Sequence, residues 1–156
     1  MSKAVNVLEH PTKAERGRAA GFRSHGAMLG ETLGARMLGA SIYDLDPGES
    51  VCPYHYELGR EEWLLVLDGR PSVRTPEGEE ELAPWDVVCF PEGPEGAHGV
   101  SNRTDAPARV LVVSTKEVPV VWVYPDSRKL GVSGINGFFR FDDAVGYWHG
   151  EEHASD

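Results

Sequence analysis

Residues 48–69 read GESVCPYHYELGREEWLLVLDG, and this stretch decides the fold that the sequence predicts. His55 and Glu57 stand two positions apart in a run rich in Val and Tyr, and a β-strand sends such residues to the same face. Glu62 follows a short Leu-Gly-Arg bend and opens a hydrophobic strand that ends at Asp68-Gly69. If the two strands pair as a hairpin, Glu62 faces the other two side chains. The stretch therefore predicts strands that carry side chains of metal-binding type.

A second segment, residues 90–102, reads FPEGPEGAHGVSN and supplies another histidine, His98, where a further strand begins. Two imidazoles and two carboxylates inside an all-β shell form a candidate metal site. Each group alone is more often a surface residue. Four polar groups that project inward from apolar strands, however, are costly to bury without a metal, a partner or water. The sequence therefore favours metal binding over an empty interior.

Short strands and turns alternate on both sides of these segments. Even spacing of short strands, with Gly, Pro and Asp in the turns, indicates a sandwich or barrel. The sequence has no Gly-rich phosphate loop and no helical repeat. We predict an all-β fold with strands at residues 37–45, 51–57, 62–67, 72–75, 80–82, 87–90, 98–102, 108–115 and 118–124.

A chain of 156 residues suits one domain with a single core. We expect residues 1–37 to form an N-terminal arm, residues 38–124 a β-barrel, and residues 125–156 a C-terminal extension that packs on the barrel or on a partner. The extension contains the apolar patch Phe138–Phe141. Because this patch and the barrel edges need cover, we expect a homodimer.

The formal net charge of −10 opposes binding to nucleic acid or to an anionic membrane. No apolar run reaches the length of a membrane span, and the N-terminal residues lack the apolar core of a signal peptide. We therefore expect a cytoplasmic protein without nucleic-acid or membrane partners. Cys52 and Cys89 are expected to be reduced thiols within strands.

These residues resemble the two motifs of the cupin superfamily. The first motif is matched by Gly48, His55, Glu62 and Gly69, and the second by Pro91, Gly93, His98 and Asn102. The resemblance covers about residues 40–115, and a family-like Tyr-Pro-Asp-Ser stretch follows at Tyr124–Ser127. It implies a small single-domain cupin of the cupin-2 type, with a double-stranded β-helix (jelly-roll barrel) extended at both ends. Trp85 stands where the family commonly has glycine, so the turn there is strained if it needs a positive φ.

The resemblance implies the metal ligands His55, Glu57, Glu62 and His98. The family usually has a histidine where this chain has Glu57, so three histidines and one glutamate become two histidines and two carboxylates. If Glu57 does not bind the metal, a two-histidine, one-carboxylate triad remains, and Glu57 can act as a general base. Glu61 competes with Glu62 but points to the opposite face of the strand, and the family match favours Glu62. Such ligands suit divalent iron, manganese, nickel or zinc.

The main functional hypothesis is a metal-dependent cupin enzyme that acts on a small organic molecule in the barrel mouth. The reaction is an oxygenation, an isomerisation or a decarboxylation, and the fold does not choose because cupins host many chemistries. The alternative is a non-catalytic module that binds or senses a small molecule or a metal. A metal-free epimerase-like cupin, with His55 or His98 as the base, is a third hypothesis.

Overall fold

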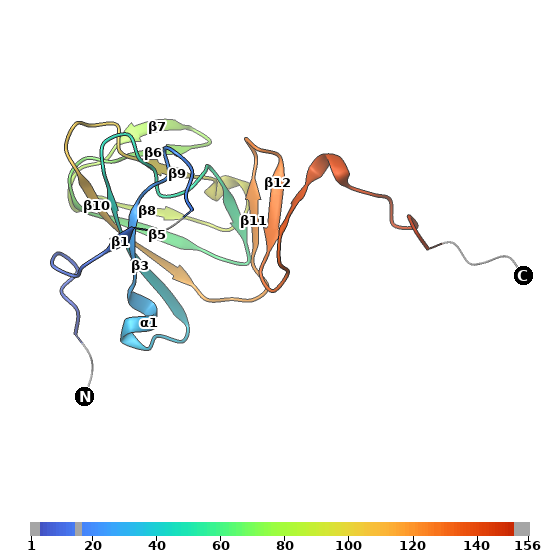
Figure 1. Ribbon diagram of the computed structural model, residues 1–156, viewed down its shortest axis with the longest axis horizontal. Helices are drawn as coiled ribbons and strands as arrows, with labels where there is room; N and C mark the ends of the chain where they lie inside the picture. Colours follow the sequence, from blue (N-terminus) through green and yellow to red (C-terminus); the bar gives the residue numbers. More distant parts are fainter. Residues whose placement is uncertain (1–3, 15–16, 152–156) are drawn as a thin grey trace, which may run out of the picture.

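The computed structural model describes residues 4–14 and 17–151 of the chain. The strands are β1 Lys13–Ala14, β2 His25–Met28, β3 Leu38–Leu45, β4 Tyr56–Leu58, β5 Glu62–Asp68, β6 Ser72–Thr75, β7 Gly78–Glu81, β8 Val87–Phe90, β9 Gly99–Ser101, β10 Ala108–Thr115, β11 Val121–Tyr124, β12 Lys129–Val132 and β13 Phe138–Arg140. The helical segments are α1 Leu29–Leu33 and the 3-10 turns η1 Pro94–Gly96 and η2 Phe141–Asp143. The predicted all-β class is confirmed (Figure 1).

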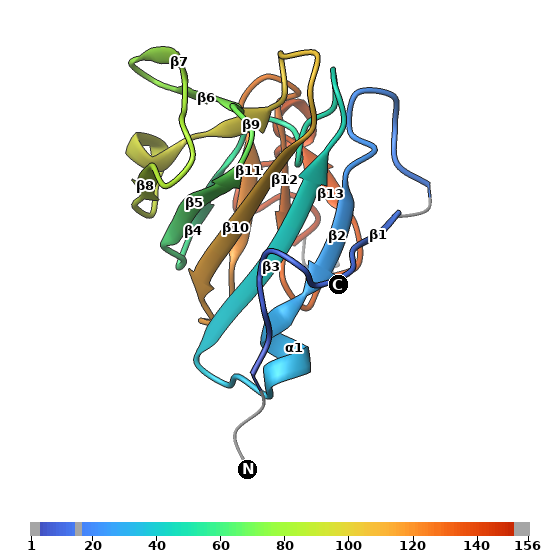
Figure 2. The same ribbon diagram turned by 90° about the vertical axis from the view of Figure 1, so that its left-hand side faces the viewer.

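The strands form three antiparallel sheets. A six-stranded sheet has the order β1-β2-β3-β10-β5-β8, a four-stranded sheet the order β13-β12-β11-β4, and a three-stranded sheet the order β7-β6-β9. Strand β10 pairs with β3 along its whole length and with β5 on its other side, and Figure 2 shows these strands side by side. The most apolar predicted strand therefore lies within the largest sheet, where both of its edges are paired.

The hydrophobic core lies between the six-stranded and three-stranded sheets. Leu64 and Val66 of β5 and Val110 of β10 have no exposed surface. Val73 of β6 and Val100 of β9 pack against them from the other sheet. These residues alternate with outward-facing ones along each strand, as the pleat requires. Full burial of such a side chain contributes about 1.5–3 kcal/mol, so the core holds the sheets that frame the pocket described below.

Two details differ from the prediction around residues 51–57. Only β4 at the end of this segment is a strand, because residues 51–54 form bends around Pro53, which has no N–H for a ladder. Strand β4 pairs with β11, and β5 pairs with β10 and β8, so the expected hairpin between β4 and β5 does not form. Gly59, with a φ of 79°, turns the chain between the two sheets instead.

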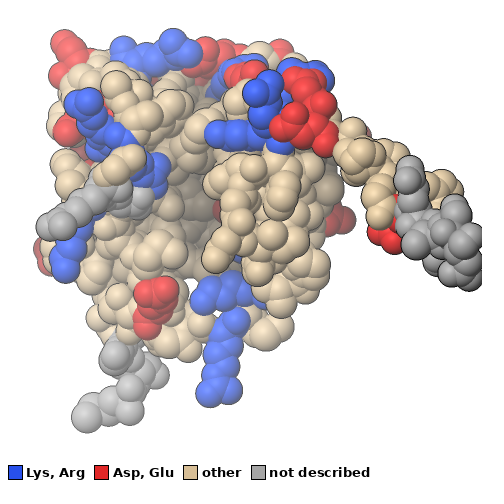
Figure 3. Space-filling model, turned by 45° about the vertical axis from the view of Figure 1, so that its right-hand side comes forward, with Lys and Arg blue, Asp and Glu red and all other residues tan. Residues whose placement is uncertain are grey.

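The strands β1, β2, β12 and β13 were not predicted from the sequence. Strand β2 pairs with β3. Residues 129–132, within the expected C-terminal extension, form β12 between β11 and β13. A Cβ on Gly131 would lie 2.8 Å from the ring of Phe138, so glycine lets that ring pack on the strand. Beyond β13 the chain leads away from the body of the molecule (Figures 1 and 3).

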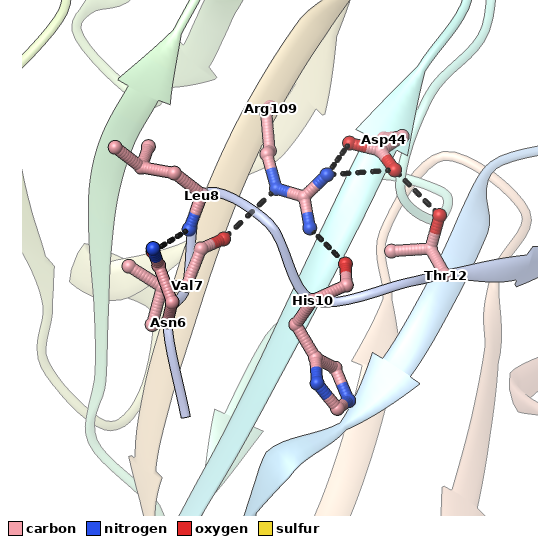
Figure 4. Close-up of polar contacts among 7 residues, drawn as sticks. All are labelled: Asn6, Val7, Leu8, His10, Thr12, Asp44 and Arg109. Carbon is pink, nitrogen blue, oxygen red and sulfur yellow. Dashed lines mark hydrogen bonds and ion pairs between the residues drawn. The ribbon is translucent and has the colours of Figure 1, made fainter. Parts of the chain in front are cut away.

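An N-terminal strap, residues 4–14, crosses the outer face of the six-stranded sheet and is held there by Arg109 of β10 (Figure 4). The Nε of Arg109 donates to the carbonyl of Val7 at 3.0 Å, and its Nη2 donates to the carbonyl of His10. The same guanidinium pairs with Asp44 of β3 at 3.1 Å. One side chain therefore fastens the strap to two adjacent strands.

We predict that Arg109→Met lowers the free energy of unfolding by about 2–4 kcal/mol, because it leaves a partly buried carboxylate and two carbonyls without their donor. Urea denaturation measures the loss, and limited proteolysis should cut the strap faster. The matched control is Arg103→Met, which removes an exposed ion pair to Glu79 and should cost less than about 1 kcal/mol. Equal losses in the two variants would contradict this role of Arg109.

Candidate metal centre and its pocket

A pocket with a volume of about 240 Å³ lies where residues of the six-stranded and four-stranded sheets meet. All four predicted site residues line it: His55, Glu57, Glu62 and His98. Its walls also include the aromatic rings of Phe90, Trp122 and Tyr124, and the side chains of Arg18 and Arg60. The pocket therefore combines a polar floor with aromatic walls, as small-molecule sites commonly do.

His55 and His98 are distant in the sequence but are joined by an isolated antiparallel bridge. The backbone N–H of His55 donates to the carbonyl of His98 at 2.9 Å, and the reverse bond measures 2.8 Å. The ring centroids lie 4.7 Å apart, and both residues are buried. The backbone itself thus brings the two imidazoles together.

Both imidazoles are held in the tautomer that a metal requires. Nδ1 of His55 lies 3.1 Å from the carbonyl oxygen of Pro53, and Nδ1 of His98 lies 2.9 Å from that of Gly96. A carbonyl oxygen can only accept, so each Nδ1 carries a proton, and in the neutral ring the lone pair remains on Nε2. The ring of Phe90 stacks on His98 at 3.7 Å and 8°, which fixes the plane of that imidazole.

Glu62, the first residue of β5, completes a group of three. One ligand atom from each of His55, Glu62 and His98 lies within 4.8 Å of the others, and Oε2 of Glu62 is 3.4 Å from Nε2 of His98. Two electron-rich atoms this close repel each other unless a cation, either a proton on Nε2 or a metal ion, lies between them. Metal–ligand bonds of about 2.0–2.2 Å place neighbouring ligand atoms about 3 Å apart, so the 3.4 Å spacing of Glu62 and His98 suits a metal ion.

The protonation states in the group also suit a metal. Burial and, after it, the nearby His98 lower the pKa of His55 to about 4, so His55 is neutral at pH 7. Burial opposes ionisation of Glu62, but the hydrogen bond and charge of His98, helped by His55 and Arg60, hold the pKa of Glu62 below its usual value. Neutral imidazole and ionised carboxylate are the forms that bind metals.

Glu57 lies in the same pocket but outside the three-residue group. Its side chain is 5% exposed, and its buried Oε2 has no hydrogen-bond partner among the described residues. Arg60 is its neighbour: Nη1 donates to Oε1 at 3.3 Å, and Nε lies 3.3 Å from Oε2. Burial raises the pKa of Glu57 to about 7, the charge of Glu62 adds to this rise, and Arg60 opposes it. Glu57 thus supplies a protonatable carboxyl group beside the group of three.

Glu61 and Asn102, two polar residues considered in the sequence analysis, lie outside the pocket. The carboxylate of Glu61 accepts a hydrogen bond from the indole N–H of Trp63 at 2.9 Å, and neither residue lines the pocket. The buried Asn102 donates to the carbonyl of Leu45 at the end of β3 at 2.9 Å and to that of Ala106 at 2.7 Å, and it does not line the pocket. The structure therefore groups Glu62, not Glu61, with the histidines.

Several pocket residues, among them Arg18, Arg60 and Tyr124, were not predicted from the sequence. Arg18 donates from Nη1 to the carbonyl of Val51 at 2.6 Å, and Arg60 contacts Glu57. Tyr124 stacks on His55 at 5.6 Å and 20°, and burial raises the pKa of its phenol to about 12. The family-like stretch that begins at Tyr124 was a signal for that residue. No local pattern could place Arg18, because its position depends on long-range contacts of the N-terminal segment.

Both cysteines are free, as predicted. Cys89 lies in β8, but Cys52 lies in the bends before His55 rather than in a strand. The sulfur of Cys52 is 3.6 Å from Nδ1 of His55, and burial raises the pKa of this thiol to about 12. At neutral pH Cys52 is therefore a thiol, not the thiolate that metals bind.

The fold and the site together define a class of protein: a small β-sandwich whose sheets enclose a His-Glu-His group. Residues 41–114 match the family model described as the Cupin domain. This region is a cupin domain and the chain has the cupin fold, which confirms the resemblance seen in the sequence.

Solved structures are similar to nearly the whole chain. A sugar phosphate isomerase from a cupin superfamily, from Silicibacter pomeroyi, is 25% identical, with a TM-score of 0.79 over 91% of this chain and 95% of its own. A protein named as a sugar phosphate isomerase from Acidithiobacillus ferrooxidans is 23% identical, with a TM-score of 0.80 over 89% and 90%. The polyketide cyclase RemF from Streptomyces resistomycificus is 27% identical, with a TM-score of 0.61 over 77% and 84%.

A search of curated proteins finds no significant match. Within the described residues, no helix is long and apolar enough to cross a membrane.

Proposed function

We propose that this chain is a metal-dependent enzyme that isomerises a small organic molecule by proton transfer. The observation that carries the proposal is the 3.4 Å approach of Nε2 of His98 to Oε2 of Glu62, with His55 in the same group and the protonatable Glu57 beside it. Of the three reaction types left open by the sequence, isomerisation is the one named for the Silicibacter pomeroyi protein, which is similar along 91% of this chain.

His55, Glu62 and His98 would hold the metal. Their donor set, two imidazole nitrogens and a carboxylate oxygen, suits divalent iron, manganese, nickel or zinc. When bound, such an ion supplies a Lewis acid that polarises a substrate oxygen. The hydrogen bonds from both Nδ1 atoms to backbone carbonyls hold the rings in place whether or not the ion is bound.

Glu57 would move the proton. Its Oε2 is buried in the pocket 3.3 Å from Nε of Arg60, and Oε1 accepts a hydrogen bond from Nη1 of the same side chain. The carboxylate takes a proton from the hydroxyl-bearing carbon next to a substrate carbonyl and returns it to the carbonyl carbon. The hydroxyl proton passes to the former carbonyl oxygen, so the product is an isomer of the substrate and no other reactant is needed. The rings of Phe90, Trp122 and Tyr124 line the same pocket.

A non-catalytic module that holds a small ligand or a metal is the second candidate. The contact between Arg60 and Glu57 favours it, because a carboxylate paired with a guanidinium is a weaker base. The two candidates differ in whether bonds to carbon break in the pocket.

Solvent-deuterium exchange separates the candidates. Untagged protein loaded with Fe²⁺, Mn²⁺, Ni²⁺ or Zn²⁺ is incubated in D₂O with a panel of aldose and ketose phosphates, and the products are followed by NMR. We expect deuterium next to the carbonyl of at least one compound, with metal-loaded protein only. Metal binding without exchange would favour the binding module, and exchange by metal-free protein would favour the metal-free epimerase hypothesis.

We also infer that two copies associate. Phe138 and Phe139 of the edge strand β13 are 58% and 47% exposed, and Tyr147 and Trp148 beyond it are exposed as well. Apolar side chains on an open edge need cover, and a twofold dimer covers the same patch on both copies. Light scattering after size-exclusion chromatography should give twice the chain mass, and Phe139→Glu should reduce it to one chain. A monomeric parent protein would contradict the inference.

A further inference from the structure

The pocket carries two arginines that the proposed proton transfer leaves without a binding role. We propose that Arg18 and Arg60 bind an anionic oxygen group of the substrate, a phosphate or a carboxylate. This inference rests on the proposed metal-dependent function and names the substrate class for that site. The guanidinium is a planar fork of donors that matches such groups.

The two arginines reach the pocket from different elements. Arg18 belongs to the N-terminal segment, and Arg60 lies in the loop between β4 and β5. The side chain of Arg60 is 21% exposed, and its Nε lies 3.3 Å from Oε2 of Glu57.

The balance of charge favours an anion. Among the described residues, the charged side chains that line the pocket are Arg18, Arg60, Glu57 and Glu62. The two guanidinium groups offset the two carboxylates when both are ionised. A divalent cation held by the histidines and Glu62 would then leave excess positive charge in a largely buried pocket, although the formal net charge of the chain is −10. An anionic substrate group would neutralise this excess where the low dielectric makes the attraction strong.

Arg18 is held over the pocket by the loop that precedes His55. Its Nη1 donates to the carbonyl of Val51 at 2.6 Å. The backbone N–H of Ser50 donates to the carbonyl of Gly21 at 2.8 Å, which ties the segment after Arg18 to the same loop. The position of Arg18 therefore depends on the backbone of that loop.

Titration of the metal-loaded protein with inorganic phosphate tests the proposal. Isothermal titration calorimetry should show phosphate binding that Arg18→Gln weakens at least tenfold, with the metal content unchanged in elemental analysis. Arg18→Lys should recover part of the affinity. The matched control is Arg23→Gln, because Arg23 lies on the same segment but its side chain does not line the pocket. Acetate, titrated in parallel, distinguishes a carboxylate site from a phosphate site.

The outcomes separate this inference from the proposed function. Metal binding with equal phosphate affinity in Arg18→Gln and the parent protein would overturn the inference and leave the metal site intact. No binding of either anion would also overturn it. If no metal binds, the proposed function fails, whereas phosphate binding by the metal-free protein that Arg18→Gln weakens would still support the arginine site. Should Arg18→Gln misfold, Arg60→Gln tests the same group from the other side of the pocket.

Discussion

His98→Ala is expected to remove the bound metal, and the affinity for a divalent first-row ion should fall by more than ~100-fold. This loss exceeds the one caused by removing a residue that only hydrogen-bonds to a metal ligand. The variant deletes one of three donors, and Glu62 and His55 alone cannot complete the group. Elemental analysis of untagged protein measures the metal content. Thermal unfolding with and without added metal provides a second readout, since an ion that binds only the folded state at 100 times its Kd adds about 2.7 kcal/mol of stability.

The control for this experiment is His149→Ala, the same substitution at an exposed histidine outside the pocket. It should leave the metal content and the metal-dependent rise in Tm unchanged. Because His98 also stacks on Phe90, circular dichroism must show that His98→Ala is folded. A folded His98→Ala that binds metal as tightly as the parent would exclude His98 as a ligand.

Glu57→Gln should reduce the rate of deuterium exchange by about 10²–10⁴-fold, the usual contribution of a general base. The amide has nearly the same size as the carboxyl group and keeps an oxygen for Arg60 to contact, but it cannot take up a proton from carbon. The metal content should stay at the parent level, because Glu57 lies outside the group formed by His55, Glu62 and His98. Exchange and metal content are measured on the same preparation.

Glu61→Gln is the matched control, since Glu61 neighbours the same loop but bonds to Trp63 outside the pocket. Glu61→Gln should change neither the rate of deuterium exchange nor the metal content. Loss of metal in Glu57→Gln would show that Glu57 is a fourth ligand, as the sequence resemblance implies. An unchanged exchange rate with metal retained would exclude Glu57 as the base.

The sequence predicted most of the sheet framework, because strands such as β6, β8 and β10 alternate or run apolar between clear turn residues. The two-residue period of a strand puts Glu61 and Glu62 on opposite faces, and the resemblance to the family favoured Glu62 as the residue near the histidines. Trp85 adopts a φ of 78°, so this turn has the positive φ at which a residue other than glycine is strained.

The contacts that complete the pocket depend on long-range packing, which local patterns do not contain. The turn at Gly59 transfers the chain from one sheet to another, although its local sequence resembles a hairpin. Arg18 reaches the pocket only because its segment bonds to the loop at residues 50–51. Strand β12 contains a glycine, so its sequence resembles that of a connecting loop. The ring that packs on this glycine, Phe138, belongs to the next strand.

Anomalous diffraction from metal-loaded crystals tests the central claim most directly. At the absorption edge of the bound metal, we predict one strong peak in the pocket, about 2.0–2.2 Å from Nε2 of His55, Nε2 of His98 and a carboxylate oxygen of Glu62. A map without a peak there, or with the imidazoles turned so that Nδ1 faces the pocket, would contradict it.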